Sequence, residues 1–207
     1  MSSGKAPRQA NTPPAAAPAR ADARRNREKL LTTARVAFAE ADATAGAVAL
    51  EVIARGAGVG IGTLYRHFPT REALVEAVYA AELDDVTGCV PALLAQYPPD
   101  RALRAWLDRY AAFIAAKRGM MDILRAGWAS GTIATPTTRE RITAVIGDIL
   151  VEGTRAGLFR ADVAPEDVTA MIFGIFLATS SNGSREQTGR LLDLVIDALR
   201  PGRATGG

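Results

Sequence analysis

The sequence predicts an all-α protein, and three observations support this fold class. Hydrophobic residues make up 48% of the 207 residues, enough to form a substantial core. Alanine and leucine dominate the apolar residues, and the alternation of β-branched residues that indicates strands is rare. No apolar run approaches the roughly eighteen residues that span a membrane. We therefore expect helices packed around one or two cores, without a membrane segment.

The charges are unevenly placed along the chain. The net charge is +3, but residues 1–29 alone carry +5. An amino-terminal excess of basic residues favours a nucleic-acid partner over a generally adhesive surface. Cys89 is the only cysteine, so an internal disulfide is excluded, and the amino-terminal segment lacks the apolar stretch of a signal peptide. We expect a cytoplasmic protein.

Residues 1–21 are rich in Ala, Pro and Arg and carry few large apolar side chains, which predicts a disordered basic tail. This tail is either a solvated leader or an arm that lies against phosphates or in a minor groove. The first helix is expected to begin near Asp22, which can cap it, and to run to about Ala41. The candidate phosphate contacts near its start are Arg24, Arg25 and Arg27.

Residues 50–68, LEVIARGAGVGIGTLYRHF, have the pattern of two short helices joined by a tight turn. The first helix should end near Ala57, because Gly58 suits the left-handed conformation of a helix cap. In the second helix Leu64 and Phe68 lie four residues apart and are expected to point inward. The side chains left on its free face are Thr63, Tyr65 and Arg66. Such a helix fits the major groove of DNA, which is about 12 Å wide.

Residues 24 to about 83 resemble the DNA-binding region of the tetracycline-repressor (TetR) family of bacterial regulators. The residues that carry the resemblance are Ala37-Phe38, Ile53-Ala54, Ala57-Gly58-Val59, Gly62 to Phe68 and Arg71-Glu72-Ala73-Leu74. The resemblance implies a homodimeric repressor that binds a palindromic double-stranded DNA operator and is released by a small-molecule effector. The residues expected at the DNA are Ile61, Thr63, Tyr65, Arg66, His67 and Arg71.

Two positions depart from the family pattern. Ala49 stands where relatives commonly have a Thr or Ser, whose hydroxyl caps the second helix and touches a phosphate. Ile61 stands where many relatives have Lys; an apolar side chain there can meet a thymine methyl group but cannot bind a phosphate. Anchoring is therefore expected to rest on backbone N–H groups, on Arg66 and Arg71, and on the amino-terminal basic residues.

We expect the rest of the chain to divide into three parts: a helix-turn-helix domain over residues 22–70, a connecting helix over 71–96, and an effector-binding and dimerisation domain over 97–207. Thr70 can cap the connecting helix, and Gly88 and Pro91 are expected to bend it. The apolar pattern predicts five helices after the break at Tyr97–Asp100, about nine in all. This number and order match the architecture of the TetR family.

In TetR relatives the inducer lies among the middle helices. Aromatic and Met side chains in that part of the chain imply an apolar or planar effector. The alternative for most of them is ordinary core packing. The candidate effector residues are Trp106, Tyr110, Phe113, Met121, Arg125, Trp128, Met171 and Phe176.

The predicted helix over residues 165–182 is apolar on more than one side. Small residues recur along it at four-residue spacing, which lets another helix approach closely. This pattern predicts a dimer interface, with a helix buried inside one subunit as the alternative. The candidate interface residues are Ala170, Gly174, Ala178, Leu192, Val195 and Leu199.

The sequence shows no catalytic or metal-binding pattern. His67 is the only histidine and has no companion ligand, and the adjacent carboxylates of Glu82, Asp84 and Asp85 diverge on a helix. Phosphate loops, nucleophile elbows and dinucleotide motifs are missing. We therefore expect no enzyme activity, no cofactor and no metal. Two other functions stay open: a helical protein-interaction adaptor, and a ligand-binding domain with vestigial DNA binding.

Overall fold

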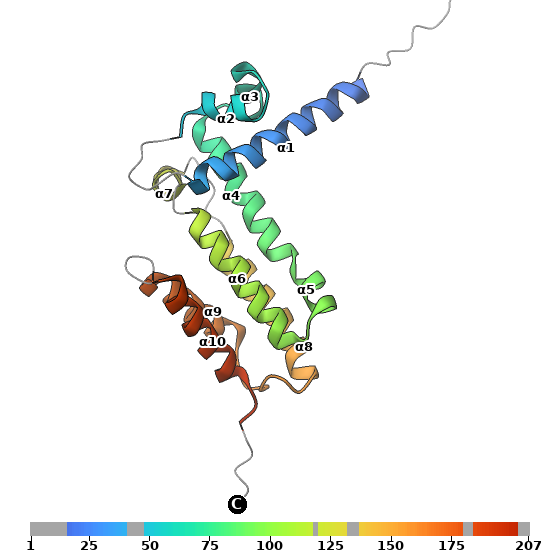
Figure 1. Ribbon diagram of the computed structural model, residues 1–207, viewed down its shortest axis with the longest axis vertical. Helices are drawn as coiled ribbons and strands as arrows, with labels where there is room; N and C mark the ends of the chain where they lie inside the picture. Colours follow the sequence, from blue (N-terminus) through green and yellow to red (C-terminus); the bar gives the residue numbers. More distant parts are fainter. Residues whose placement is uncertain (1–15, 41–47, 118–119, 132–136, 180–183, 203–207) are drawn as a thin grey trace, which may run out of the picture.

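The computed structural model describes residues 16–40, 48–117, 120–131, 137–179 and 184–202, and these residues are mostly helical (Figure 1). The predicted all-α class is confirmed. Segments 43–47, 132–135 and 182–183, where loops or a helix end were expected, lie outside the described residues. The helices are α1 (Ala16–Glu40), α2 (Leu50–Gly56), α3 (Ile61–His67), α4 (Arg71–Gly88), α5 (Val90–Gln96), α6 (Pro99–Lys117), α7 (Met121–Ser130), α8 (Thr138–Arg155), α9 (Pro165–Thr179) and α10 (Arg185–Leu199).

The described residues form ten helical segments because the predicted connecting helix is divided in two. α4 ends at Gly88 and α5 begins at Val90, with Cys89 between them and Pro91 in the first turn of α5. Proline is tolerated in a first turn, where its missing N–H is not needed, but it interrupts a continuing helix. The predicted bend is thus a break, and the order of the helices is otherwise the predicted one.

Helix α1 is longer at its amino end than the sequence indicated. It begins at Ala16, so residues 16–21 are helical and not part of a disordered tail. Asp22 lies inside the helix, where its carboxylate pairs with Arg25. Four of the six residues are alanine, which has the highest helix propensity, and Pro18 lies in the first turn, where proline is tolerated. This part of α1 projects beyond the body of the protein (Figure 1).

Helices α1, α2 and α3 share one small apolar core. Its buried side chains are Leu30, Ala34, Phe38, Ile53, Ala54, Leu64 and Phe68. Gly58 has a φ of +68°, the left-handed conformation predicted for the turn after α2. The Val59 N–H donates to the Ala54 carbonyl at 3.0 Å and closes this turn. The predicted helix-turn-helix is therefore present.

Helix α4 packs against both halves of the protein, since it contacts α1 as well as α6, α7 and α8. Its buried side chains are Leu74, Val75, Val78, Tyr79, Leu83 and Val86. Arg35 of α1 pairs with Glu82 of α4 and, at 2.7 Å, with Asp85. Arg141 of α8 pairs with Asp84 at 2.8 Å. Ion pairs thus add to the apolar contacts that hold α1 and α8 on α4.

The later helices extend the same apolar core around α6. Trp106 of α6 is fully buried, and its indole N–H donates to the Val86 carbonyl of α4 at 2.9 Å. Helices α8 and α10 both pack against α6 and α9, and Figure 1 shows α9 and α10 side by side at the end away from α2 and α3. Within the described ranges, the helices lack the combination of length and hydropathy that a membrane span needs.

A glycine near the end of α8 makes room for a ring. A Cβ atom at Gly153 would lie 1.9 Å from Cδ2 of Phe159. Phe159 is buried, and its N–H donates to the Gly153 carbonyl at 3.2 Å. Ring and backbone therefore both close over Gly153 and leave no space for a methyl group.

We predict that Gly153→Ala destabilises the fold. Overpacking costs about 1–3 kcal/mol, which exceeds the roughly 1 kcal/mol that alanine gains over glycine inside a helix. The measurement is the thermal unfolding temperature by circular dichroism. Gly88→Ala is the matched control, because nothing lies within 4 Å of a Cβ atom at that position. Equal unfolding temperatures for wild type and Gly153→Ala would contradict the packing described.

Candidate DNA-binding and effector sites

Helix α3 presents a narrow face to solvent. Leu64 is fully buried, whereas Ile61 is 38% exposed and Tyr65, one turn later, is 45% exposed. Arg66 is also exposed, and within the described residues neither it nor Tyr65 has a side-chain partner. The half-buried residues beside them are Thr63 and His67. An apolar side chain, a phenol and a guanidinium thus share one surface, which is a set suited to base edges and methyl groups in a DNA groove.

The starts of α2 and α3 offer backbone N–H groups. The N-cap residues are Ala49 and Gly60, and neither makes a side-chain hydrogen bond to its helix. The N–H groups of Val52 and Thr63 already donate to the Ala49 and Gly60 carbonyls at 3.1 Å and 2.9 Å, so the N–H groups before them in each helix are the ones available to phosphate oxygens. This agrees with the missing hydroxyl that the sequence indicated at Ala49.

Arg71 makes a contact within the protein that the sequence did not predict. It lies half-buried in the first turn of α4, and its Nη2 donates to the Val48 carbonyl at 2.6 Å, across 23 residues of sequence. Its Nε is buried without a partner. The guanidinium therefore holds the segment that leads into α2, and a direct contact of Arg71 with DNA stays a prediction.

The junction between α3 and α4 is fixed at both ends. Phe68, just after α3, is buried, and the Arg27 guanidinium of α1 lies 5.1 Å from the centre of its ring. Thr70 caps α4 as predicted, because its Oγ1 accepts a hydrogen bond from the Ala73 N–H at 3.1 Å. The orientation of α3 is therefore tied to both α1 and α4.

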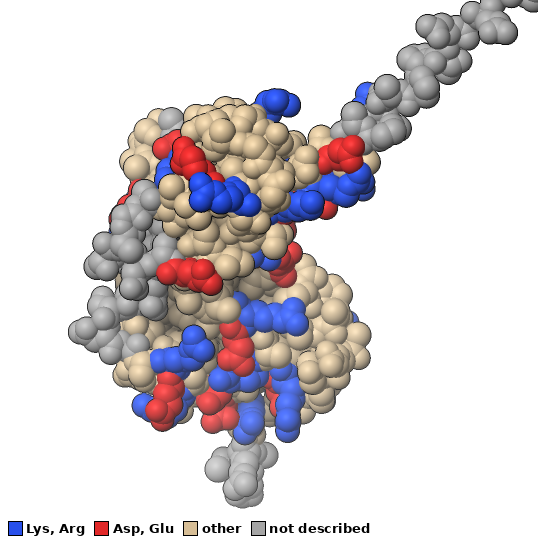
Figure 2. Space-filling model, turned by 45° about the horizontal axis from the view of Figure 1, so that its top comes forward, with Lys and Arg blue, Asp and Glu red and all other residues tan. Residues whose placement is uncertain are grey.

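The arginines at the amino end of α1 have partners within the protein. Arg24 pairs with Glu28 at 3.7 Å, and Arg25 pairs with Asp22. Figure 2 shows basic side chains with acidic neighbours along the projecting part of α1. Ion pairs between exposed side chains contribute little free energy, so phosphates can replace the carboxylates at small cost.

Part of the predicted effector site is a buried aromatic cluster. The Trp106 and Tyr110 rings stack with centres 5.4 Å apart, and Phe113 continues the stack 5.8 Å from Tyr110. Phe176 of α9 meets Tyr110 edge-on at 5.3 Å. Burial raises the pKa of the Tyr110 hydroxyl above its ordinary value. These rings cover one another as core residues do.

Three other predicted effector residues are not placed in this cluster. Met171 is 46% exposed on α9, and Arg125 is exposed on α7. Both are exposed and lie outside the buried aromatic cluster, and their role in an effector site stays a prediction. The side chain of Met121 lies outside the described residues.

Tyr79 and Trp128 form the other end of the aromatic cluster. Their ring centres are 6.0 Å apart and edge-on, and Phe113 lies 5.7 Å from Tyr79. The hydroxyls of Tyr79 and Thr138 share a hydrogen bond of 2.5 Å. Burial raises the pKa of Tyr79, and the bond to Thr138 and the charge of Arg141 oppose this rise. Tyr79 is not among the predicted effector residues, because nothing local in the sequence links α4 to α7.

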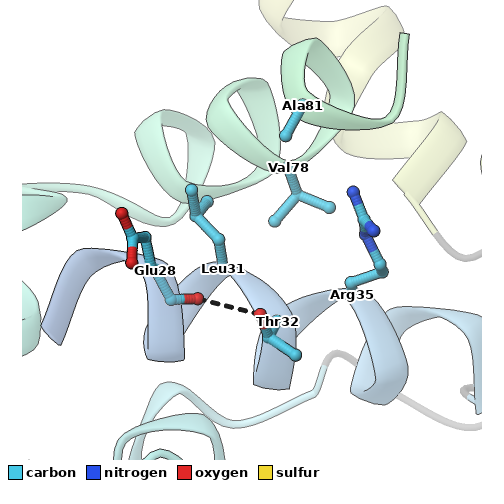
Figure 3. A pocket seen from close by; sticks show the side chains of 6 residues that line it. All are labelled: Glu28, Leu31, Thr32, Arg35, Val78 and Ala81. Atoms are coloured by element: carbon cyan, nitrogen blue, oxygen red, sulfur yellow. Dashed lines mark hydrogen bonds between the residues drawn. The ribbon is translucent and has the colours of Figure 1, made fainter. Parts of the chain in front are cut away.

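A pocket of about 170 Å³ lies between α1 and α4, where side chains such as Leu31 and Arg35 face Val78 and Ala81 (Figure 3). A second pocket of about 480 Å³ lies between α1 and α2. Neither pocket is lined by a predicted effector residue. Both belong to the joint between the helix-turn-helix and its neighbours.

The small residues predicted for a dimer interface lie on the outside of α9. The exposed residues are Ala170, Gly174 and Ala178. Met171 and Leu177 of the same helix are exposed as well. An apolar face of α9 is therefore not covered by the rest of the described chain.

The predicted interface residues of α10 need correction. Leu192, Val195 and Leu199 are buried in the core of their own subunit, because the apolar stripe of α10 faces α6 and α9. The large apolar side chain that α10 exposes is Leu194, at 63%. It was not predicted, since a stripe of apolar residues does not show which partner covers it.

Among the described residues, no group of three or more His, Cys, Asp and Glu side chains is placed to hold a metal ion. Glu82, Asp84 and Asp85 are in ion pairs with arginines instead. Burial raises the pKa of the Glu82 carboxyl, and the neighbouring Arg35 opposes this rise.

We predict that Arg71→Ala lowers the thermal unfolding temperature. The Val48 carbonyl would lose a charged donor at a half-exposed site, where such a bond contributes about 1–2 kcal/mol. Arg66→Ala is the matched control and should leave the temperature unchanged, because the exposed Arg66 has no partner within the described residues. Calorimetry of both variants is the measurement. Wild-type stability of Arg71→Ala would mean that the bond to Val48 does not hold the entry to α2.

Two segments of the chain match known families. Residues 30–78 match the bacterial regulatory proteins of the tetR family. Residues 98–201 match the C-terminal domain of SbtR-like transcriptional regulators. The first match covers the helix-turn-helix described above, and the second covers the exposed face of α9 and the aromatic cluster apart from Tyr79. No curated protein matches the chain.

Solved structures agree with these matches. A TetR transcriptional regulator from Streptomyces coelicolor is 45% identical, covers 85% of this chain and 99% of its own, and has a TM-score of 0.74. A TetR regulatory protein from Mycobacterium vanbaalenii is 31% identical, covers 89% and 100% of the two chains, and has a TM-score of 0.68. The family consists of DNA-binding regulators and not of enzymes. The chain belongs to the TetR family of bacterial transcriptional regulators, with an SbtR-like carboxy-terminal domain.

Proposed function

We propose that the protein is a homodimeric repressor in the cytoplasm, which binds a palindromic DNA operator and releases it when a small-molecule effector binds. The observation that carries this proposal is the exposed face of α3, where Tyr65 and Arg66 lack partners within the described residues. The other side of α3 is held by the buried Leu64, so the face is presented rigidly. In a dimer, two such helices would enter successive major grooves about 34 Å apart.

Phosphate contacts would come from groups around α3. The N–H groups at the starts of α2 and α3 have no side-chain acceptor. Arg24 and Arg25, on the projecting part of α1, can exchange their exposed carboxylate partners for phosphates. These contacts set the position of α3 and carry no sequence information, which is left to Ile61 and to its neighbours on α3.

A second copy of the chain is the proposed cover for the exposed side of α9 and α10. Met171 on α9 and Leu194 on α10 expose large apolar surfaces on two helices that pack together. Gly174 and Ala178 carry little side chain, so a helix of the partner can approach closely. Two helices from each subunit would then form the interface.

Helix α4 gives an effector a route to the DNA. It contacts α6, α7 and α8, and Arg35 ties it to α1. An effector that binds one arrangement of α4 better than another shifts the population toward that arrangement. Because the capped start of α4 follows α3 directly, this shift changes the separation of the two recognition helices.

We predict that Tyr65→Ala and Arg66→Ala each weaken operator binding by roughly 10- to 100-fold, since a base contact contributes about 1–3 kcal/mol. The measurement is fluorescence anisotropy with DNA from upstream of the protein's own gene, at several salt concentrations. Binding should weaken as salt rises. Tyr97→Ala, at an exposed site between α5 and α6, is the matched control. Unchanged affinity in both α3 variants would favour an adaptor, or a ligand-binding domain with vestigial DNA binding.

We predict that Leu194→Glu converts the dimer to monomers, because two charges would be buried in the interface without partners. Sedimentation velocity of wild type and variant is the measurement. Tyr97→Glu places the same charge at another exposed aromatic site and should remain dimeric. A wild-type monomer, or a dimeric Leu194→Glu variant, would contradict the proposed interface.

A further inference from the structure

The ammonium group of Lys117, the last residue of α6, lies against aromatic rings. Its ammonium lies 5.2 Å from the centre of the Tyr79 ring and 5.4 Å from that of Phe113. Burial lowers the pKa of this ammonium, and no neighbouring carboxylate offsets the effect. Within the described residues Lys117 has no ion-pair partner. The two ring faces offset part of the cost of withdrawing this cation from water, but they do not supply the counter-charge that a buried cation normally has.

The indole N–H of Trp128 on α7 is a second hydrogen-bond donor that has no acceptor. Its indole Nε1 is buried and makes no hydrogen bond. Buried N–H groups nearly always have a partner, so an exception needs an explanation. The Trp128 ring meets Tyr79 edge-on at 6.0 Å. The ammonium of Lys117 and the indole N–H therefore lie around the same tyrosine, and both lack an acceptor.

We propose that Lys117 and the Trp128 indole N–H bind the carboxylate of a flat, apolar organic acid, and that this acid is the effector. A carboxylate supplies the missing negative charge and has enough lone pairs for both donors. The rings of Tyr79, Phe113 and Trp128 are the surface on which a flat body stacks. The role as effector rests on the proposed function above, whereas binding of the acid does not.

Lys117, and not Arg125, is the cation at the proposed effector site. Arg125, the cation expected in the effector site, is exposed on α7. Lys117 instead reaches in among the rings on a flexible four-carbon stem. The stem lets the ammonium leave the ring faces and follow the carboxylate, so that the acid occupies the faces of Tyr79 and Phe113.

The site acts on the helix that carries the DNA-binding unit. Tyr79 belongs to α4 and shares a hydrogen bond of 2.5 Å with Thr138 of α8. One turn later on α4, Glu82 pairs with Arg35 of α1. An acid that enters between Tyr79 and Trp128 therefore separates α4 from α7, and the ion pair transmits the movement to α1.

The test is isothermal titration calorimetry of the full-length protein with benzoate, phenylacetate, 2-naphthoate and indole-3-acetate, each beside its neutral amide. We expect at least one acid to bind with a Kd below about 1 mM and roughly tenfold more tightly than its amide. The size of the best acid also reports the space available between the rings. If none of the acids binds more tightly than its amide, the proposal is overturned.

Two variants locate the site. Lys117→Met and Trp128→Phe should each weaken binding of the acid by roughly tenfold. Trp128→Phe should unfold at or above the wild-type temperature, because it removes an unpaired donor, whereas a purely structural role of the indole N–H would lower that temperature. Lys117→Met exchanges the contacts of the ammonium with the rings for those of a thioether, so its unfolding temperature should stay near that of wild type. Lys29→Met, at an exposed lysine of α1, is the matched control and should bind the acid normally. Acid binding that survives Lys117→Met would overturn the proposal.

Addition of the acid to the operator complex separates this proposal from the function it rests on. Release of DNA by wild type, lost in Lys117→Met, supports both. Acid binding without release keeps the anion site and overturns its role as the effector site. If the protein binds the operator but not the acid, the proposed carboxylate site is overturned and the proposed repressor function is unaffected.

Discussion

The packing of α4 between α1 and the later helices is the constraint on which the rest of the structure depends. Its buried face packs against α1, α6, α7 and α8, and the Val86 carbonyl of α4 accepts the indole N–H of Trp106 on α6. Ion pairs of Arg35 and Arg141 also hold α1 and α8 against α4. The exposed face of α3 is therefore held mainly by α1 and α2, and α1 in turn packs against α4 and α6. Tyr79 of α4 belongs to the aromatic cluster, so a movement of α4 disturbs that cluster.

This arrangement makes regulation a question of small free-energy differences. An effector shifts the protein only by the difference between its affinities for the two states. The unpaired donors of Lys117 and Trp128 reduce stability in the free protein. A ligand that accepts hydrogen bonds from both donors only after α4 and α7 separate would favour the separated state. The gain would equal the free energy that the unpaired donors cost in the free protein. Local instability and control of DNA binding would then have one physical origin.

The sequence predicted most of the elements that local pattern determines. The turn at Gly58 and the inward Leu64 were predictable from backbone preference and helical spacing, and Thr70 from its capping hydroxyl. The early start of α1 was missed because the composition of residues 16–21 was interpreted as a tail although its alanines favour helix.

Tertiary contacts account for the remaining differences. Arg71 faces Val48 because the fold brings together residues 23 apart in sequence, and Lys117 lies over rings from α4 and α6 that no sequence spacing relates. An apolar stripe such as that of α10 looks the same whether its own subunit or a partner covers it, so Leu192 and Leu194 could not be told apart in advance.

The central claim is that α3 lies in a major groove. Methylation interference on the operator, with the unmodified protein, tests this most directly. Methylation of guanine N7 blocks contacts in the major groove, whereas methylation of adenine N3 blocks contacts in the minor groove. The account predicts interference at guanine N7 in two half-sites whose centres lie about 34 Å apart. Interference confined to adenine N3, or to a single half-site, would contradict it.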